Sequence, residues 1–248
     1  MCCLSLATLA AAPARAQETL DGAISTNERL ASNGNEPIAR LNLGILHAAR
    51  GIDFFEADQL DEAISSFRTS LQWNPYSRDI RYNLSQALYI RAAQLKERGT
   101  PAGELAPLHG EILKEAMTVR GLDPVNSNLL KILGYTYRNL GDESRAAAVL
   151  AESAELPFDI HDVRMEVGAS ETRVTGVLRN LTLAGGDPVK LRVTLFGLSG
   201  EARGASDIQV PVPQVNQGAS FEARIRTAAR SRGDNDVAGW KYEVIGRK

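Results

Sequence analysis

Two segments of the chain follow one pattern: GIDFFEADQLDEAISSFRTSLQWNP at residues 51–75 and GYTYRNLGDESRAAAVLAESAELP at residues 134–157. In both, apolar residues recur every three or four positions, which predicts amphipathic helices. A glycine opens each segment and an aromatic residue follows three positions later. A proline ends each segment, because proline cannot continue a helix. The two segments predict a pair of helices that occurs at least twice.

The spacing has a reason in helix packing. A glycine lets the first helix touch its partner closely, an aromatic residue fills the cleft between the helices, and an alanine sits where the second helix crosses most tightly. These positions are Gly51, Phe54 and Ala63 in the first segment and Gly134, Tyr137 and Ala146 in the second.

The pattern resembles the tetratricopeptide repeat, a helix–turn–helix unit that stacks into a solenoid. The resemblance covers residues 38–157, with a degenerate middle unit between the two good copies. That unit has an insertion, which we place around Lys96 to Leu108, where glycine and proline cluster. We therefore expect a helical repeat domain at residues 17–157.

The resemblance implies a concave groove, lined by the first helix of each unit, that binds a protein or peptide partner. Carried over by position, the partner-binding groove consists of Asp79, Tyr82, Asn83, Gln86, Tyr89, Asn128, Lys131, Tyr135, Arg138 and Asn139. Tyrosine supplies contact area at little entropy cost. A solvated inner face is the alternative. The carboxylate clamp of chaperone-binding repeats is not supported, because Tyr135 rather than asparagine follows Lys131 by one turn.

An apolar helical stripe upstream, at Leu20–Ala31, is expected to cap the first repeat. The groove face of that repeat would carry Ile45, Ala48, Ile52 and Phe55. These side chains are too apolar to face water, and a solenoid needs a terminal cap.

The last part of the chain, residues 158–248, changes to short runs that alternate apolar and polar residues. Val189–Leu195 is the clearest, with one face predicted to be buried and one wet. The six predicted strands are Val163–Val167, Arg173–Leu181, Val189–Leu195, Ile208–Val212, Ser220–Thr227 and Gly239–Ile245. Several short strands separated by turns predict an antiparallel β-sandwich. The fold class is thus α + β, with a helical solenoid followed by a sandwich.

The details resemble the small Ig-like domain of FxLYD type found in bacterial secreted proteins. Val174–Asn180 looks like its V-x-G-x-V-x-N strand. Val193–Gly200 looks like its V-T-F-Y-D-x-x-G turn, with Gly197 where aspartate is usual. Gln217–Phe221 looks like its P-G-…-F bend, with glutamine in place of proline. These motifs describe packing and turns, so they indicate a fold rather than an activity.

Residues 1–16 read as a secretory signal peptide, with an apolar run at Leu4–Ala12 and small residues before Gln17. No basic residue precedes the run, which a start codon assigned too far downstream would explain. A buried N-terminal helix is the weaker alternative. Because Cys2 and Cys3 both lie in this segment, the mature chain would contain no thiol. We expect an exported protein, periplasmic or extracellular, with no transmembrane span.

The sequence shows no signature of catalysis, of a cofactor or of a metal site. His47, His109 and His161 have no partner at metal-ligand spacing, and His161-Asp162 at the junction is interpreted as a hinge rather than as a dyad. The sequence contains no Gly-x-Ser-x-Gly nucleophile elbow, no phosphate-binding glycine-rich loop and no dinucleotide-binding fingerprint. The net charge of −2 argues against a nucleic-acid partner. We expect no enzyme, no cofactor and no metal.

The resulting hypothesis is a non-enzymatic protein–protein interaction scaffold of the bacterial envelope that binds its partner through the groove. The alternative is an envelope-surface or anionic-polymer-binding protein that acts through the sandwich. That alternative uses a run of arginines, Arg224, Arg226, Arg230 and Arg232. A solvated sheet face explains the same arginines without a ligand.

Overall fold

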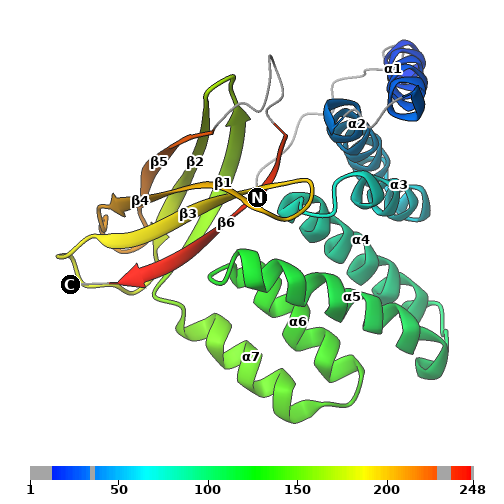
Figure 1. Ribbon diagram of the computed structural model, residues 1–248. Helices are drawn as coiled ribbons and strands as arrows, with labels where there is room; N and C mark the ends of the chain where they lie inside the picture. The colour runs from blue at the N-terminus through cyan, green and yellow to red at the C-terminus, as the bar shows by residue number, and fades with distance from the viewer. Residues whose placement is uncertain (1–12, 34–36, 228–235, 247–248) are drawn as a thin grey trace.

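The computed structural model describes residues 13–33, 37–227 and 236–246. Seven helices precede six strands in this part of the chain (Figure 1). The helices are α1 Pro13–Asn33, α2 Pro37–Glu56, α3 Leu60–Trp73, α4 Arg78–Glu97, α5 Ala102–Leu122, α6 Ser127–Asn139 and α7 Glu143–Glu155. The strands are β1 Phe158–Val167, β2 Glu171–Asn180, β3 Val189–Gly197, β4 Ala202–Val210, β5 Gly218–Arg226 and β6 Val237–Gly246. The predicted order, helices followed by an antiparallel β part, is confirmed.

The helices α2 to α7 form three consecutive pairs, and the close crossings occur where the repeat pattern predicts them. A Cβ added at Gly51 would lie 2.5 Å from the ring of Phe67, and one added at Gly134 would lie 2.6 Å from Leu150. Ala63 is fully buried at the first crossing. Glycine is thus required at both positions because a neighbouring side chain occupies the space.

The insertion in the middle unit lengthens its second helix instead of forming a long loop. α5 has 21 residues, against 14 for α3 and 13 for α7, the second helices of the other pairs. Only a short turn joins α4 to α5, and Gly99 supplies its left-handed backbone with φ +86°. Pro107 lies inside α5, where the cluster of glycine and proline suggested irregular chain.

The first helix packs on α2 but does not cover the predicted face. Its contacts include a 3.1 Å hydrogen bond from Asn42 to Asn27. Ile45 is 63% exposed and Ile52 is 38% exposed. The prediction that a cap covers these side chains is wrong, because they project from a different side of α2. Of the four predicted face residues, Ala48 is buried and Phe55 is half-buried.

The strands form two antiparallel sheets of three, in the orders β1-β2-β5 and β4-β3-β6. Every predicted strand overlaps an observed one, although β1 and β4 begin earlier than predicted. The buried residues of β3 alternate with wetter ones, as expected. No helix in the described part of the chain is long and apolar enough to cross a membrane. The finer assignment, an Ig-like sandwich of FxLYD type, stays a prediction.

The residues quoted for that resemblance have identifiable roles. Gly176 pairs with Phe221 across β2 and β5, and a Cβ there would lie 2.6 Å from the Phe221 ring. Asn180 is fully buried and donates to the carbonyls of Leu183, at 2.9 Å, and Pro213, at 2.8 Å. Gly200 forms the β3–β4 turn with φ +82°. Each motif residue fixes a turn or a strand contact.

The two parts of the chain share one hydrophobic core. A single cluster of buried side chains includes Leu130 and Leu133 of α6 together with Leu178, Leu191 and Trp240 of the strands. The change from helix to strand falls between Glu155 and Phe158, beside the predicted boundary. That residues 17–157 and 158–248 are separate domains stays a prediction.

Candidate functional site

A buried polar cluster fixes the β part against α4 and α5. Asp123, at the end of α5, is 1% exposed and accepts hydrogen bonds from Arg78 of α4 and from Tyr242 of β6. Asn126 donates a third, at 2.9 Å. The guanidinium of Arg78 also lies over the ring of Trp240, 5.4 Å from its centroid. A buried carboxylate requires this many partners, so the cluster holds the strands in one position.

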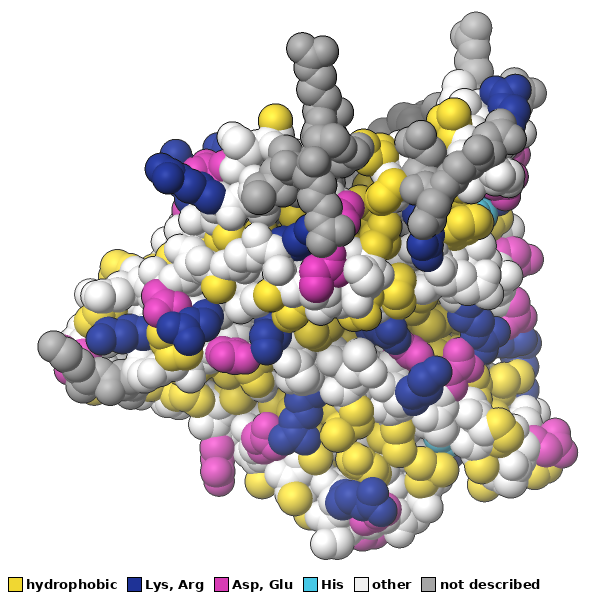
Figure 2. Space-filling view, viewed as in Figure 1, with side chains coloured by type: hydrophobic (Ala, Val, Ile, Leu, Met, Phe, Trp, Pro, Cys, Tyr) yellow, Lys and Arg dark blue, Asp and Glu magenta, His cyan; other side chains and the backbone are white. Residues whose placement is uncertain are grey.

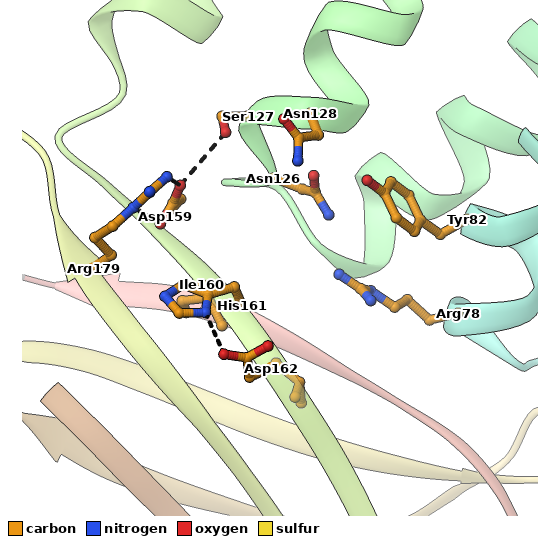
Figure 3. A pocket seen from close by; sticks show the side chains of 11 residues that line it. Arg78, Tyr82, Asn126, Ser127, Asn128, Asp159, Ile160, His161, Asp162 and Arg179 are labelled. Atoms are coloured by element: carbon orange, nitrogen blue, oxygen red, sulfur yellow. Dashed lines mark hydrogen bonds and ion pairs between the residues drawn. The ribbon is translucent and has the colours of Figure 1, made fainter. Parts of the chain in front are cut away.

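Beside this cluster lies a polar pocket of about 330 Å³, which we call the junction pocket. It is lined by Arg78, Tyr82, Asn126, Ser127, Asn128, Asp159, Ile160, His161, Asp162, Val163 and Arg179. Figure 3 shows Arg78, Tyr82 and Asn128 directed into one space, with β1 on the opposite wall. The pocket therefore lies between the helices and the strands.

The charges in the junction pocket are largely neutralised within the protein. Asp159 is buried and accepts hydrogen bonds from the Nε and Nη2 atoms of Arg179. Its carboxylate also lies 3.5 Å from the Ser127 hydroxyl. Hydrogen bonding to this carboxylate raises the pKa of Arg179. Arg78 is paired with Asp123 and with Asp79. A ligand entering the pocket thus meets few free charges.

His161 and Asp162 lie on β1 at the mouth of the junction pocket. The imidazole Nδ1 lies 2.8 Å from the Asp162 carboxylate, and the Asp162 side chain is 74% exposed. Asp162 has φ +52°, and the pairing of β1 with β2 shifts register here. The interpretation of this dipeptide as a hinge is wrong, because it forms a β-bulge within a paired strand.

A second hollow of about 240 Å³ lies between α4 and α6, and we call it the tyrosine hollow. It is lined by Gln86, Tyr89, Ile90, Asn128, Lys131, Ile132 and Tyr135. Tyr135 is 41% exposed and Ile90 is 38% exposed. Burial raises the pKa of Tyr89, and the neighbouring Tyr135 adds to the shift. Half of the predicted groove residues meet here: Gln86, Tyr89, Asn128, Lys131 and Tyr135.

The other predicted groove residues lie outside the tyrosine hollow. The Tyr82 ring packs against the shared core while its hydroxyl accepts a 3.1 Å hydrogen bond from Gln86, and burial raises its pKa. Asp79 pairs with Arg78, and Asn83 is half-buried on α4. Arg138 lies over the Tyr135 ring, and Asn139 accepts from Lys96 at 3.0 Å. The groove is thus open at Tyr135, while at Tyr82 it narrows to the junction pocket, whose opposite wall is β1.

Sequence reasoning missed two side chains of the tyrosine hollow, Ile90 and Ile132. The spacing of Gln86 and Ile90, four positions apart on a helix, was a usable signal. So was the spacing of Ile132 and Tyr135. No comparable signal marked the β1 wall of the junction pocket, because its place depends on how the strands pack against the helices.

Other candidate chemistry is sparse in the part of the chain that the structure describes. No group of three His, Cys, Asp or Glu side chains there could hold a metal ion. Arg224 pairs with Glu222, and Arg173 lies 3.2 Å from Glu166. Figure 2 shows basic and acidic side chains interleaved over the face in view. Within the run of arginines, Arg224 thus has an acidic partner, while Arg230 and Arg232 lie outside the described residues.

No protein-family model and no curated protein matches the sequence. Parts of the chain are similar to solved structures of MamA. The structure MamA MSR-1 C2 is 17% identical, covering 56% of this chain and 67% of its own, with a TM-score of 0.36. MamA AMB-1 P212121 is 16% identical, covering 55% and 72%, with a TM-score of 0.37. Because these TM-scores are low, the likeness carries no argument about function.

Proposed function

We propose that the protein is a non-enzymatic interaction scaffold whose helices bind a peptide segment of a partner protein in the tyrosine hollow. One observation carries this proposal: Tyr135 and Ile90 are partly exposed around a hollow that also holds amide side chains. Exposed apolar side chains gathered in one place mark an interaction site. The hollow has the character of a binding pocket, mostly apolar with a few polar groups.

The size of the hollow favours a peptide side chain over a whole metabolite. About 240 Å³ is below the range of roughly 300–1,000 Å³ typical of small-molecule pockets. The amides of Gln86 and Asn128 offer both donors and acceptors, which suits a peptide backbone. A bulky side chain would enter between Tyr89 and Tyr135 while its backbone meets these amides.

A photo-crosslinking amino acid placed at position 135 tests the proposal in the cell. The expected result is a crosslinked adduct of discrete mass at position 135. The same probe at Met117 of α5, which is 45% exposed, is the control and should give none. Equal adducts at both positions, or none at either, would contradict the proposal that the tyrosine hollow is the binding site.

Export belongs to the same proposal, which places the scaffold in the bacterial envelope. Residues 1–12, including the apolar run and both cysteines, lie outside the described residues, and residues 13–16 begin α1. The mature protein is expected to begin at Gln17. Mass spectrometry of the cell-envelope fraction checks this, and a mature chain that retains Cys2 and Cys3 would contradict it.

Polymer binding through the β part remains the alternative proposal. It requires an excess of positive charge on that surface, yet Arg173 and Arg224 have carboxylate partners. Binding of a polyanion should vanish at high salt, whereas insertion of an apolar side chain in the tyrosine hollow should largely persist. A salt titration of the bound partner therefore separates the two proposals.

A further inference from the structure

The junction pocket and the tyrosine hollow are neighbouring parts of one surface. Asn128 lines both of them. On α4, Tyr82 of the junction pocket and Gln86 of the hollow are one turn apart and are joined by a 3.1 Å hydrogen bond. The surface therefore runs from β1, across Tyr82 and Asn128, to Tyr89 and Tyr135. We call it the composite groove.

The two ends of the composite groove differ in charge. At the β1 end the Asp162 carboxylate is 74% exposed, and its partner is the neighbouring His161. At the far end Lys131 is exposed and has no ion pair among the described residues. Between them lie neutral groups, the Tyr82 hydroxyl and the Gln86 and Asn128 amides. Arg78, Asp159 and Arg179 do not change this polarity, because each is neutralised by a partner within the protein.

We infer that the composite groove takes an extended peptide of a partner protein with a basic side chain toward Asp162 and a carboxylate toward Lys131. A bulky apolar side chain lies between these charges, in the tyrosine hollow. This inference rests on the proposed function and adds the β part as a second wall of the site. Complementary charges at the two ends fix the direction in which the peptide lies.

Two groups of a peptide could supply the carboxylate that meets Lys131. It is either an Asp or Glu side chain within the peptide or the carboxylate of a free C-terminus. Asp162 selects a basic side chain in both cases. The probe is therefore a library of random linear peptides displayed in two formats, one with a free C-terminus and one flanked by inert sequence on both sides.

The library is selected on the whole protein and on two charge-reversal variants, Asp162→Lys and Lys131→Glu. Both side chains are exposed, and because Asp162 has φ +52°, where lysine is less favourable than aspartate, circular dichroism and thermal melting check that both variants fold. Lys114→Glu and Glu104→Lys are the matched controls, because both residues are exposed on α5. The wild type should enrich peptides with a bulky apolar residue between a basic residue and a carboxylate.

Asp162→Lys should weaken the binding of a selected peptide at least ten-fold. Replacing the basic residue of the peptide with an acidic one should restore binding. Lys131→Glu should weaken binding to a similar extent. Binding should be restored when an acidic residue of the peptide is replaced with a basic one, or when a C-terminal carboxylate is amidated. The control variants should bind as the wild type does. Enrichment that responds to Lys131→Glu but not to Asp162→Lys would overturn the composite groove and leave the proposed function standing. Absence of enrichment in both formats would overturn both.

Discussion

Asn74 donates a hydrogen bond from its side chain to the backbone carbonyl of Ala238 at 2.7 Å, and this bond joins the end of the first helix pair to β6. The next residues of the same loop also contact the strands. A Cβ at Gly239 would collide with the Tyr76 carbonyl, and one at Gly200 would collide with the Tyr76 ring. Two glycines of the β part therefore make room for one loop of the helical part.

The buried cluster around Asp123 should dominate the stability of this interface. Asp123→Ala leaves the buried guanidinium of Arg78 without its main partner, and we expect a loss of about 3–5 kcal/mol in the free energy of unfolding. Asp79→Ala is the control, because Asp79 is 50% exposed and a surface pair contributes about 0–1 kcal/mol. Urea denaturation measures both. Equal, small losses would show that the cluster does not hold the interface.

The shared core predicts that the helical and β parts unfold together. Leu156, Phe158 and Ile160 flank the predicted boundary, and all three are buried in the common cluster. Separately expressed residues 17–157 and 158–248 should each expose this apolar surface and melt well below the intact chain. Differential scanning fluorimetry makes the comparison. Two fragments that melt at the temperature of the intact chain would establish independent domains.

Alanine substitution should have opposite effects on stability at two glycines of the helices. Gly134→Ala forces a Cβ against Leu150, and we expect overpacking to cost about 1–3 kcal/mol. Gly110→Ala on α5 meets no atom within 4 Å and should instead stabilise the helix by up to about 1 kcal/mol. Thermal melting of the two variants should give shifts of opposite sign. A stabilised Gly134→Ala variant would contradict the close crossing.

Stability should fall as the pH drops from 7 to 5. Burial lowers the pKa of both His47 and His109 below the ordinary 6.5, with Arg50 and Lys96 adding to the respective shifts. The unfolded chain then binds more protons, so this stability is full above pH 6.5 and is lost as the pH falls from 6.5 through the lowered pKa values of the folded state.

The carboxyl groups of Asp142 and Glu243 have pKa values lowered from 3.8 and 4.5, so they titrate below this window. Melting temperatures between pH 5 and pH 7 therefore report the histidines. The double variant His47→Gln with His109→Gln should flatten this dependence. An unchanged dependence of the melting temperature on pH would show that groups other than these two histidines cause it.

Local patterns in the sequence predicted the elements of the fold well, because their causes are local. The repeat spacing predicted a close helix crossing at Gly51, and the alternation of Val189–Leu195 located β3. The length of α5 was missed because glycine and proline near the start of a helix do not always break it. The exposure of Ile45 was missed because it depends on which side of α2 the first helix covers.

The candidate site could be predicted only for its helical half. Tyr89, Lys131 and Tyr135 were carried over by position from the resemblance to the tetratricopeptide repeat, and the structure brings them together. The placement of Tyr82 against the strands depends on the docking of β6, which no short stretch of sequence encodes. The same holds for Asp162, whose contribution arises from a bulge in β1.

The affinity of a library-selected peptide for Tyr135→Ala tests the central claim, that the tyrosine hollow binds a partner peptide. Because a central aromatic side chain commonly carries at least 2 kcal/mol of binding, we expect the dissociation constant to rise by roughly 30-fold or more. The melting temperature should stay nearly unchanged, since Tyr135 is 41% exposed. Met117 is similarly exposed, on α5, and Met117→Ala should change neither the dissociation constant nor the melting temperature. An unchanged dissociation constant for Tyr135→Ala would contradict the claim.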